Sequence, residues 1–351
     1  LALICALFTL AGCVSAPPIT HFQVVGTHNS YKRSIDGALV AAASGGGRDL
    51  GSVDYAHLPL RDQLNLGIRS LELDVFNDPD GGAYASPLGM AMLRMAGITP
   101  LDHGGGGDIH APGFKVIHDC DFDYRTWNLD LRDALVELRS WSTANPDHHP
   151  IVITVNTKEG DPWMEGGTVA IGFDVEAMDN LDTIIREALG DHLLVPDDVR
   201  LGRETLREGV LAGGWPSLDH ARGKYVWVLD QGGSPKSAYL EARPGTKGGV
   251  FFTTGNDSED TAAFFIINNP IRDHDKIRSL VRRGFMVRTR ADAGLREARE
   301  RDYARFEAAK SSGAQVISTD FPIPDRLIDR EYMIRFDDMG FVRPNPVIDS
   351  D

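Results

Sequence analysis

The 351-residue chain is poor in cysteine, and this limits what can hold its fold together. Of its three cysteines, Cys5 and Cys13 fall in an apolar N-terminal stretch, and Cys120 alone lies in the body of the chain. A lone thiol forms no internal disulfide, so the fold has to be stabilised by its hydrophobic core. We interpret Cys120 as a packing residue rather than a nucleophile.

Basic charge is also scarce. The chain has 36 lysines and arginines against 51 aspartates and glutamates, which gives a formal net charge of −15 at pH 7. No basic stripe stands out that would neutralise a phosphate backbone, so we expect no nucleic-acid partner. The overall field does not attract anions, and an anionic substrate would have to be held by a local group of cations or a metal ion.

Apolar runs long enough to cross a bilayer are missing as well. The run at residues 1–12 is too short for that and is typical of the apolar part of an export signal. It ends in Leu10-Ala11-Gly12-Cys13, which resembles the cleavage box of bacterial lipoproteins, in which the cysteine is acylated. We therefore expect residues 1–20 to be a signal segment and short linker, with lipidation at Cys13 anchoring an exported protein to a membrane. The alternative is an ordinary secretory signal, cleaved near Ser15-Ala16, and a freely secreted protein. No transmembrane span is predicted in the mature chain.

Short apolar runs alternate with stretches of helical periodicity along the rest of the chain. Most of these runs are apolar on both faces, as strands covered by helices should be. Eight strands are predicted, at 22–26, 68–75, 115–118, 151–156, 225–230, 262–267, 285–289 and 314–318. Helices are predicted at 58–66, 129–142, 178–189, 271–283 and 293–311. This alternation predicts an α/β fold, a single (β/α)₈ barrel of the TIM type over residues 21–325.

Three segments interrupt the alternation and a fourth follows it. Residues 77–113, 157–175 and 231–261 are predicted to be long loop insertions on the mouth side of the barrel, where loops usually shape a binding site. The proline-containing end from residue 321 is expected to be loosely ordered, and residues 326–351 are counted as a C-terminal tail.

Polar residues that carry chemistry stand where four of the predicted strands end. His28 and Asn29 follow the first strand; histidine can donate to a developing phosphoryl charge, and an asparagine oxygen can bind a hard cation. Glu72 and Asp74 lie two residues apart, so one face of the second strand carries both carboxylates, close enough to share a divalent ion. A capping or turn role for the first pair, and salt bridges of the carboxylates to Arg61 or Arg69, are the alternatives.

Further candidates follow the third, fourth and seventh strands. His118 ends the third strand and is a second candidate acid or base, because histidine changes its protonation near neutral pH; Asp119 would orient it or face solvent. After the fourth strand, Asn156 offers an oxygen ligand, Lys158 an ammonium for a phosphate, and Glu159 a further carboxylate. Arg288 would suit a polyol phosphate, with an ion pair to Asp292 as the alternative.

With these residues in place, the chain resembles the calcium-dependent phosphatidylinositol-specific phospholipase C family of bacteria. The resemblance covers roughly residues 20–325, almost the whole mature chain. It is carried by Gly26-Thr-His-Asn-Ser-Tyr31, Leu71-Glu-Leu-Asp-Val-Phe76, Pro112-Gly-Phe-Lys-Val-Ile-His118, Val287-Arg-Thr-Arg-Ala-Asp292 and Ser312-Gly-Ala-Gln-Val-Ile-Ser-Thr-Asp-Phe-Pro322.

The resemblance implies a mechanism and a set of roles. Asn29, Glu72 and Asp74 would hold Ca²⁺, and the inositol 2-hydroxyl would attack the phosphorus. His28 would stabilise the transition state, and His118 would protonate the departing diacylglycerol oxygen. A cyclic inositol phosphate would form first. An all-oxygen shell also favours Ca²⁺ or Mg²⁺ over Zn²⁺.

The chain departs from the eukaryotic relatives of this family on the fourth strand, where a calcium-binding glutamate is usual and Asn156 stands here. The fourth ligand is therefore left open between Asn156 and Glu159. Lys158 and Arg288 are the expected contacts to the phosphate and headgroup. The implied partner is a phosphoinositide lipid at a membrane surface, and we expect a monomer.

Two other functions compete with this interpretation. One is a glycerophosphodiester phosphodiesterase on the same barrel, although its first-strand histidine is typically followed by arginine, whereas this chain has Asn29. The other is a catalytically weak, tethered lipid-binding protein, suggested by Asn156. The presence of both His28 and His118 argues against the second, because a binding protein needs no proton donors.

Overall fold

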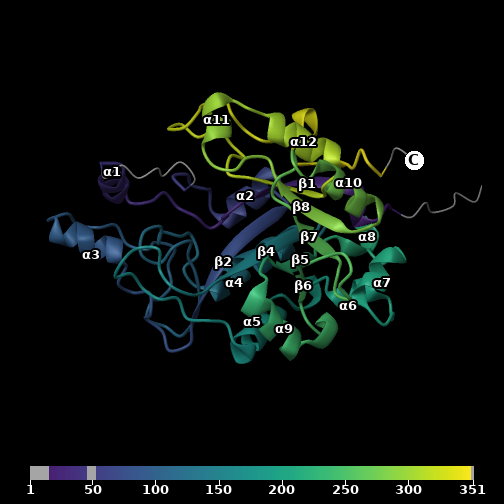
Figure 1. The fold of residues 1–351 in the computed structure, drawn as a ribbon, viewed down its shortest axis with the longest axis horizontal. Helices are drawn as coiled ribbons and strands as arrows, with labels where there is room; N and C mark the ends of the chain where they lie inside the picture. Colours follow the sequence, from purple (N-terminus) through teal and green to yellow (C-terminus); the bar gives the residue numbers. More distant parts are fainter. Residues whose placement is uncertain (1–15, 46–52, 349–351) are drawn as a thin grey trace, which may run out of the picture.

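The computed structural model describes residues 16–45 and 53–348. The expected signal segment up to residue 15 and the expected lipidation site Cys13 lie outside the described residues. Figure 1 shows a sheet whose strands cross the middle of the molecule, with helices on its outer sides. Within the described ranges, no helix combines the length and the apolar character needed to cross a membrane.

The sheet contains eight parallel strands arranged as a nearly closed barrel, which confirms the predicted TIM-type fold. The order around the barrel is β6-β5-β4-β2-β1-β9-β8-β7. Every neighbouring pair in this order is parallel. The barrel strands are β1 (Phe22–Thr27), β2 (Ser70–Asp78), β4 (Ile151–Lys158), β5 (Tyr225–Leu229), β6 (Phe251–Thr253), β7 (Phe264–Ile266), β8 (Met286–Arg290) and β9 (Val316–Thr319).

Two strand predictions were wrong, although the total of eight was right. The run predicted as the third barrel strand forms β3 (Gly113–Val116), which pairs antiparallel with the last four residues of β2 and lies off the barrel path. The missing barrel strand is β6, inside the segment 231–261 that was predicted to be a loop. The reason is geometric. β2 is nine residues long and continues past the end of β1, so its last residues have an open edge, which pairs with β3 from the insertion. β6 takes its place in the barrel with only three residues.

The predicted helices are present at shifted boundaries. They are α2 (Leu60–Leu66), α4 (Leu131–Ala144), α5 (Val175–Leu189), α10 (His274–Arg282), α11 (Arg296–Glu300) and α12 (Ala304–Ser312). Further helices occur in segments predicted as loops or left unassigned: α1 (Gly37–Gly45), α3 (Leu88–Met95), α6 (Pro196–Arg200), α7 (Leu206–Leu211), α8 (Leu218–Ala221) and α9 (Gly233–Ala242). The two longest begin at aspartate caps, because Asp130 and Asp174 accept hydrogen bonds from the otherwise unpaired first-turn N–H groups.

Three groups of buried apolar residues make up the core. One fills the space between the strands and outer helices such as α4 and α5, and a second fills the barrel interior and extends under α7 and α10. The third lies outside the barrel, under α1, α3 and β3, and includes Phe76, Tyr84 and Phe122. Figure 1 shows α1 and α3 together at one end of the molecule, beyond the end of β2. The insertion 77–113 is therefore a small packed layer, not an open loop.

The expectation of a loosely ordered C-terminal tail was also wrong for the residues up to 348. β10 (Val342–Pro344) pairs antiparallel with β1. Tyr332, Ile334 and Phe336 alternate along the chain and are buried against the outer core. Prolines in this segment limit regular structure, but they do not prevent alternate side chains from packing.

We expect Phe336→Ala to lower the free energy of unfolding by about 3 kcal/mol, because it removes a large buried aromatic side chain. Leu327→Ala, in the same tail but 93% exposed, is the matched control and should change stability by less than about 0.5 kcal/mol. Urea titration followed by circular dichroism measures both. Equal stabilities of the two variants would show that the tail does not support the core.

Candidate active site

The carboxyl ends of the barrel strands bring the predicted residues of β1, β2, β4 and β8 together. His28 follows β1, and its Nε2 lies 3.8 Å from Oε1 of Glu72 on β2. Glu72 in turn forms a buried ion pair with Arg288 on β8. On the other side, Asp74 lies 2.8 Å from the ammonium of Lys158 on β4. These side chains form one continuous charged layer at the barrel mouth.

His28 is held by a buried carboxylate that sequence reasoning did not assign. Its Nδ1 lies 2.8 Å from Oδ1 of Asp320, which directly follows β9, and 2.8 Å from the Tyr55 hydroxyl. Burial alone would raise the pKa of Asp320, but Arg290 and His28 lower it far below its usual value. Asp320 is therefore ionised and orients the imidazole, whose Nε2 faces Arg290 at 3.3 Å.

The turn that carries His28 and Asn29 needs particular residues. At Gly26 a side chain would collide with Ser70, since a Cβ there would lie 2.5 Å from the Ser70 Cβ. Asn29 adopts a φ of 51°, a left-handed conformation that asparagine tolerates better than most residues. Its Nδ2 donates to the Tyr55 hydroxyl at 2.9 Å. The amide nitrogen thus faces Tyr55, which leaves the Oδ1 atom to act as a ligand.

Glu72 and Asp74 are both buried, and cations offset both charges. Burial raises the pKa of Glu72, yet the guanidinium of Arg288 and the neighbouring His28 and Arg290 outweigh that effect and lower it overall. The alternative pairing of Arg288 with Asp292 is not formed. Asp292 instead accepts hydrogen bonds from Thr319 and from the backbone of Asp320.

Asp230 is a second carboxylate that sequence reasoning did not single out. It directly follows β5, one residue beyond the Val155–Leu229 register pair, and this places it at the same level of the barrel as Asn156. Burial raises its pKa to about 6, against the opposing effect of Arg288 and with added repulsion from Glu72 and Asp74. A carboxylate directly after a strand is a recognisable signal, but the predicted strand 225–230 ended one residue too late and included Asp230.

The two candidates for a fourth ligand occupy different surroundings. Asn156 is half-buried and is the register partner of Asp74 in the β2–β4 ladder. Glu159 is exposed, and its carboxylate accepts hydrogen bonds from Ser234 at 2.7 Å and from the backbone of Phe173 at 3.2 Å. Asn156 therefore lies at the level of the charged layer, whereas Glu159 links its own loop to the segment at Ser234 through a hydrogen bond.

His118 follows β3 and is oriented by a different carboxylate from the one considered in the sequence. Its Nδ1 lies 2.8 Å from Oδ2 of Asp123. Asp119 instead accepts hydrogen bonds from the backbone of Asp121 and Phe122 and from the Trp163 indole. Both histidines thus carry a buried carboxylate on Nδ1, and both side chains are 20% exposed. His118 adjoins the charged layer through the backbone, because the Ile117 N–H donates to the Asp74 carbonyl at 3.3 Å.

The donor chemistry at this mouth fits a hard divalent cation. Asn29, Glu72, Asp74 and Asn156 offer only oxygen or amide donors, the type that Ca²⁺ and Mg²⁺ prefer. Both carboxylate oxygens of Asp74 are buried, and the Lys158 ammonium forms an ion pair with Oδ2 at 2.8 Å. Across the described residues, no three histidine, cysteine, aspartate or glutamate side chains form a ready-made metal cluster. Any ion held here would therefore share these carboxylates with Lys158 and Arg288.

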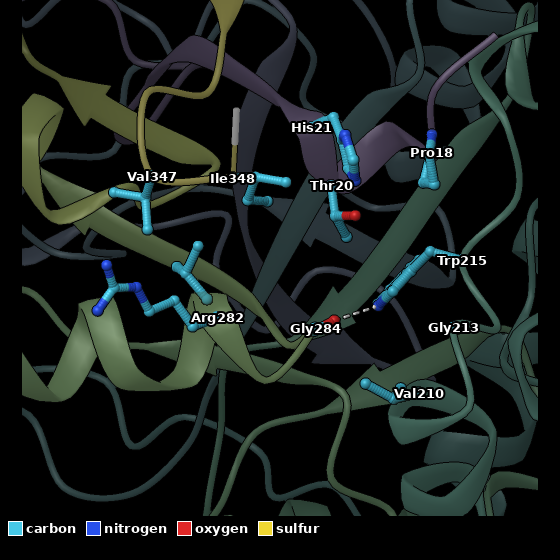
Figure 2. Close-up of a pocket in the computed structure, with 11 residues that line it drawn as sticks. Pro18, Thr20, His21, Val210, Gly213, Trp215, Arg282, Gly284, Val347 and Ile348 are labelled. Carbon is cyan, nitrogen blue, oxygen red and sulfur yellow. Dashed lines mark hydrogen bonds between the residues drawn. The ribbon is translucent and has the colours of Figure 1, made fainter. Parts of the chain in front are cut away.

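A separate hollow of about 220 Å³ lies on the opposite, amino-terminal side of the barrel (Figure 2). It is bordered by Pro18 and Thr20 before β1, by Trp215, and by Val347 near the chain end. The Trp215 indole donates to the Gly284 carbonyl at 3.0 Å. None of the residues of the charged layer lines it, so it is not part of the candidate active site.

Comparisons with known proteins bear on the fold and the family of the chain. The family model described as calcium-dependent phosphoinositide phospholipase C matches residues 18–346. Among solved structures, the calcium-dependent phosphoinositol-specific phospholipase C of a Gram-negative Pseudomonas species, in apo form with myoinositol, is 15% identical with a TM-score of 0.59. That match covers 94% of this chain and 96% of the other.

A second structure, the Ca²⁺-dependent phosphatidylinositol-specific phospholipase C of Streptomyces antibioticus, is 18% identical with a TM-score of 0.53. It covers 87% of this chain and 95% of the other. At these identities the structures establish the fold alone, and no curated protein matches the chain. The family model, however, spans nearly all of the sequence. The chain therefore belongs to the calcium-dependent phosphoinositide phospholipase C family, whose members are phosphodiesterases.

Proposed function

We propose that this protein is a Ca²⁺-dependent phospholipase C that cleaves the phosphodiester of phosphatidylinositol-type lipids. The products are diacylglycerol and a cyclic inositol phosphate, which is then hydrolysed. The observation that carries the proposal is the pairing of two partly exposed imidazoles, each with a buried carboxylate on Nδ1, beside a layer of oxygen donors and cations. This combination of groups suits metal-assisted phosphodiester cleavage.

We assign Asn29, Glu72, Asp74 and Asn156 as the residues that would hold Ca²⁺. Asn29 would bind through Oδ1, because Tyr55 receives its amide N–H. Asp230 lies at the same level and adds negative charge to a shell in which Asn156 is neutral. When bound, Ca²⁺ would lower the pKa of the attacking hydroxyl and offset charge on the phosphate.

The protein's own groups account for the proton transfers. The inositol 2-hydroxyl attacks the phosphorus and gives its proton to a carboxylate of the Glu72–Asp74 group. His28 donates from Nε2 to a phosphoryl oxygen as negative charge develops there, and Arg290 beside it adds positive charge. The bond from phosphorus to the diacylglycerol oxygen breaks, and His118 supplies the proton to that oxygen. Lys158 and Arg288 contact the phosphate and the headgroup.

The proposed location of the reaction is a membrane surface outside the cytoplasm. Acylation of Cys13 would tether the enzyme there, and export without acylation would leave it free. The proposed substrate and the proposed tether agree, because a lipid headgroup is reached only at a bilayer surface.

We expect calcium chelation to abolish lipid hydrolysis and re-addition of Ca²⁺ to restore it. Asp74→Asn should raise the Ca²⁺ concentration for half-maximal activity by about tenfold or more, because one charged ligand is lost. Asp219→Asn, on the exposed surface of α8, is the matched control and should leave this concentration unchanged. Full activity in excess chelator would remove the metal from the mechanism.

His28→Ala and His118→Ala should each lower kcat by about two orders of magnitude or more, since each removes a proton donor or a charge stabiliser of the transition state. His220→Ala, an exposed histidine bonded to Ser217, is the control and should retain wild-type kcat. Steady-state assays on mixed micelles measure all three. Retention of activity in either of the first two variants would contradict its assigned role.

The substrate class is tested by comparing product release from phosphatidylinositol, glycerophosphoinositol and phosphatidylcholine, with and without added Ca²⁺. We expect Ca²⁺-dependent release from phosphatidylinositol and none from phosphatidylcholine, which has no hydroxyl placed for internal attack. Faster cleavage of the water-soluble glycerophosphodiester would favour a glycerophosphodiester phosphodiesterase. Binding of phosphatidylinositol without release would favour a lipid-binding protein.

A further inference from the structure

A buried lysine lies between the two histidines of the site. Lys32 has no exposed surface, although lysine is seldom buried without a partner. Its ammonium lies 2.7 Å from Oδ2 of Asp123 and 3.0 Å from the carbonyl oxygen of Tyr55. The ammonium also lies over the Tyr55 ring, 5.0 Å from its centre.

Each partner of Lys32 contacts one of the histidines. Oδ2 of Asp123, the atom that binds Lys32, is also the atom 2.8 Å from Nδ1 of His118. The hydroxyl of Tyr55 reaches Nδ1 of His28 at 2.8 Å and Nδ2 of Asn29 at 2.9 Å. One ammonium therefore connects the turn after β1 with the loop after β3.

The backbone around Lys32 holds the same two segments. Its N–H donates to the Asn29 carbonyl at 3.0 Å, and its own carbonyl accepts from the His57 N–H at 3.0 Å. It also pairs as an isolated bridge with Thr126, three residues beyond Asp123. The position of the ammonium is thus set by the main chain on both sides, so it can act as a rigid spacer.

Packing alone does not explain a charge at this position. Removing an ammonium from water is unfavourable, and a well-packed apolar side chain of similar length often stabilises a core as well or better. Lys115 offers a comparison, because it is the other lysine among the largest fully buried side chains. Its ammonium lies 4.0 Å from Asp78 and 4.0 Å from Asp130 and donates to the carbonyls of Asp108 and Ala111, so its partners differ from those of Lys32.

We propose that Lys32 is a positioning residue of the reaction. It fixes the Asp123 carboxylate that orients His118, and it keeps His118 in register with His28 through Tyr55. This inference rests on the proposed acid role of His118. Lys32 would act on the substrate indirectly, through Asp123 and Tyr55.

The shared carboxylate oxygen has a chemical consequence. Burial would raise the pKa of Asp123, but Lys32 and His118 lower it overall, so the carboxylate stays ionised. Lys32 and His118 bind the same carboxylate oxygen, so the position and the charge of Lys32 act directly on the contact that orients the imidazole. Other charged or titratable groups near this cluster are Asp119 in the same loop, Lys158 on β4, Tyr31 and Asp74 beside Asp123, and Tyr55 and His57 beside Lys32.

The test is the pH–rate profile of Lys32→Met, a neutral residue of similar length, on phosphatidylinositol. We expect kcat to fall about tenfold or more with KM changed less than about threefold, because His118 is misplaced rather than the binding site lost. The alkaline limb, where the acid loses its proton, should move up by about one pH unit, since Asp123 then serves His118 alone. Lys32→Arg keeps the charge and should leave the limb near its wild-type position.

Lys115→Met is the matched control, since it also removes a fully buried ammonium from the same part of the molecule. It should lower stability without moving the alkaline limb. If Lys32→Met does not fold, Lys32→Gln decides: its amide still donates a hydrogen bond but carries no charge, so the limb should move in the same direction. An unmoved limb with wild-type kcat in a folded neutral variant, or an equal shift in Lys115→Met, would overturn the proposal.

Failure of this inference is distinguishable from failure of the proposed function. If wild-type protein does not release diacylglycerol from phosphatidylinositol, or if His118→Ala is fully active, the proposed reaction itself is wrong. If those results are as expected but the Lys32 variants behave like the wild type, only the positioning role is wrong.

Discussion

Glu72 and Arg288 form a buried ion pair that joins β2 to β8 across the barrel mouth, and the arrangement of the site depends on such pairs. Charges in a low-dielectric interior are tolerated only when they are compensated, so each carboxylate fixes the position of a cation and each cation that of a carboxylate. Arg290 and Asp320 form a similar pair beneath His28. The ionisable groups are therefore oriented before any substrate or metal arrives, which is the preorganisation that electrostatic catalysis requires.

The two histidines acquire their buried carboxylate partners in different ways. His28 sits on a barrel strand end and takes its carboxylate from the neighbouring strand β9, whereas His118 lies in an added antiparallel hairpin and takes Asp123 from its own loop. β3 lies outside the barrel, so contacts between its following loop and the barrel are needed to fix the position of His118. Lys32 supplies such contacts, because it binds Asp123 on one side and the Tyr55 segment on the other.

Sequence reasoning predicted the repeating parts of the fold and missed the local exceptions. Long amphipathic stretches such as α4 and α5 were recognisable, because apolar residues recur at helical spacing. β6, with only three residues, fell below the length at which a strand pattern can be detected. β3 has the composition of a barrel strand, and only its antiparallel pairing with β2 shows that it is not one.

By itself, the sequence determined the fold class and the family, and it singled out His28, Glu72, Asp74 and His118 as candidate site residues, because strand ends and carboxylate spacing are local properties. Only the tertiary structure decided which partner each of them has. Asp320 is 292 positions from His28 and Arg288 is 216 from Glu72, so no local pattern links them. Their proximity follows from closing the sheet through the β1–β9 and β8–β9 pairs, and the energetic demand that buried charges be matched then selects which groups meet.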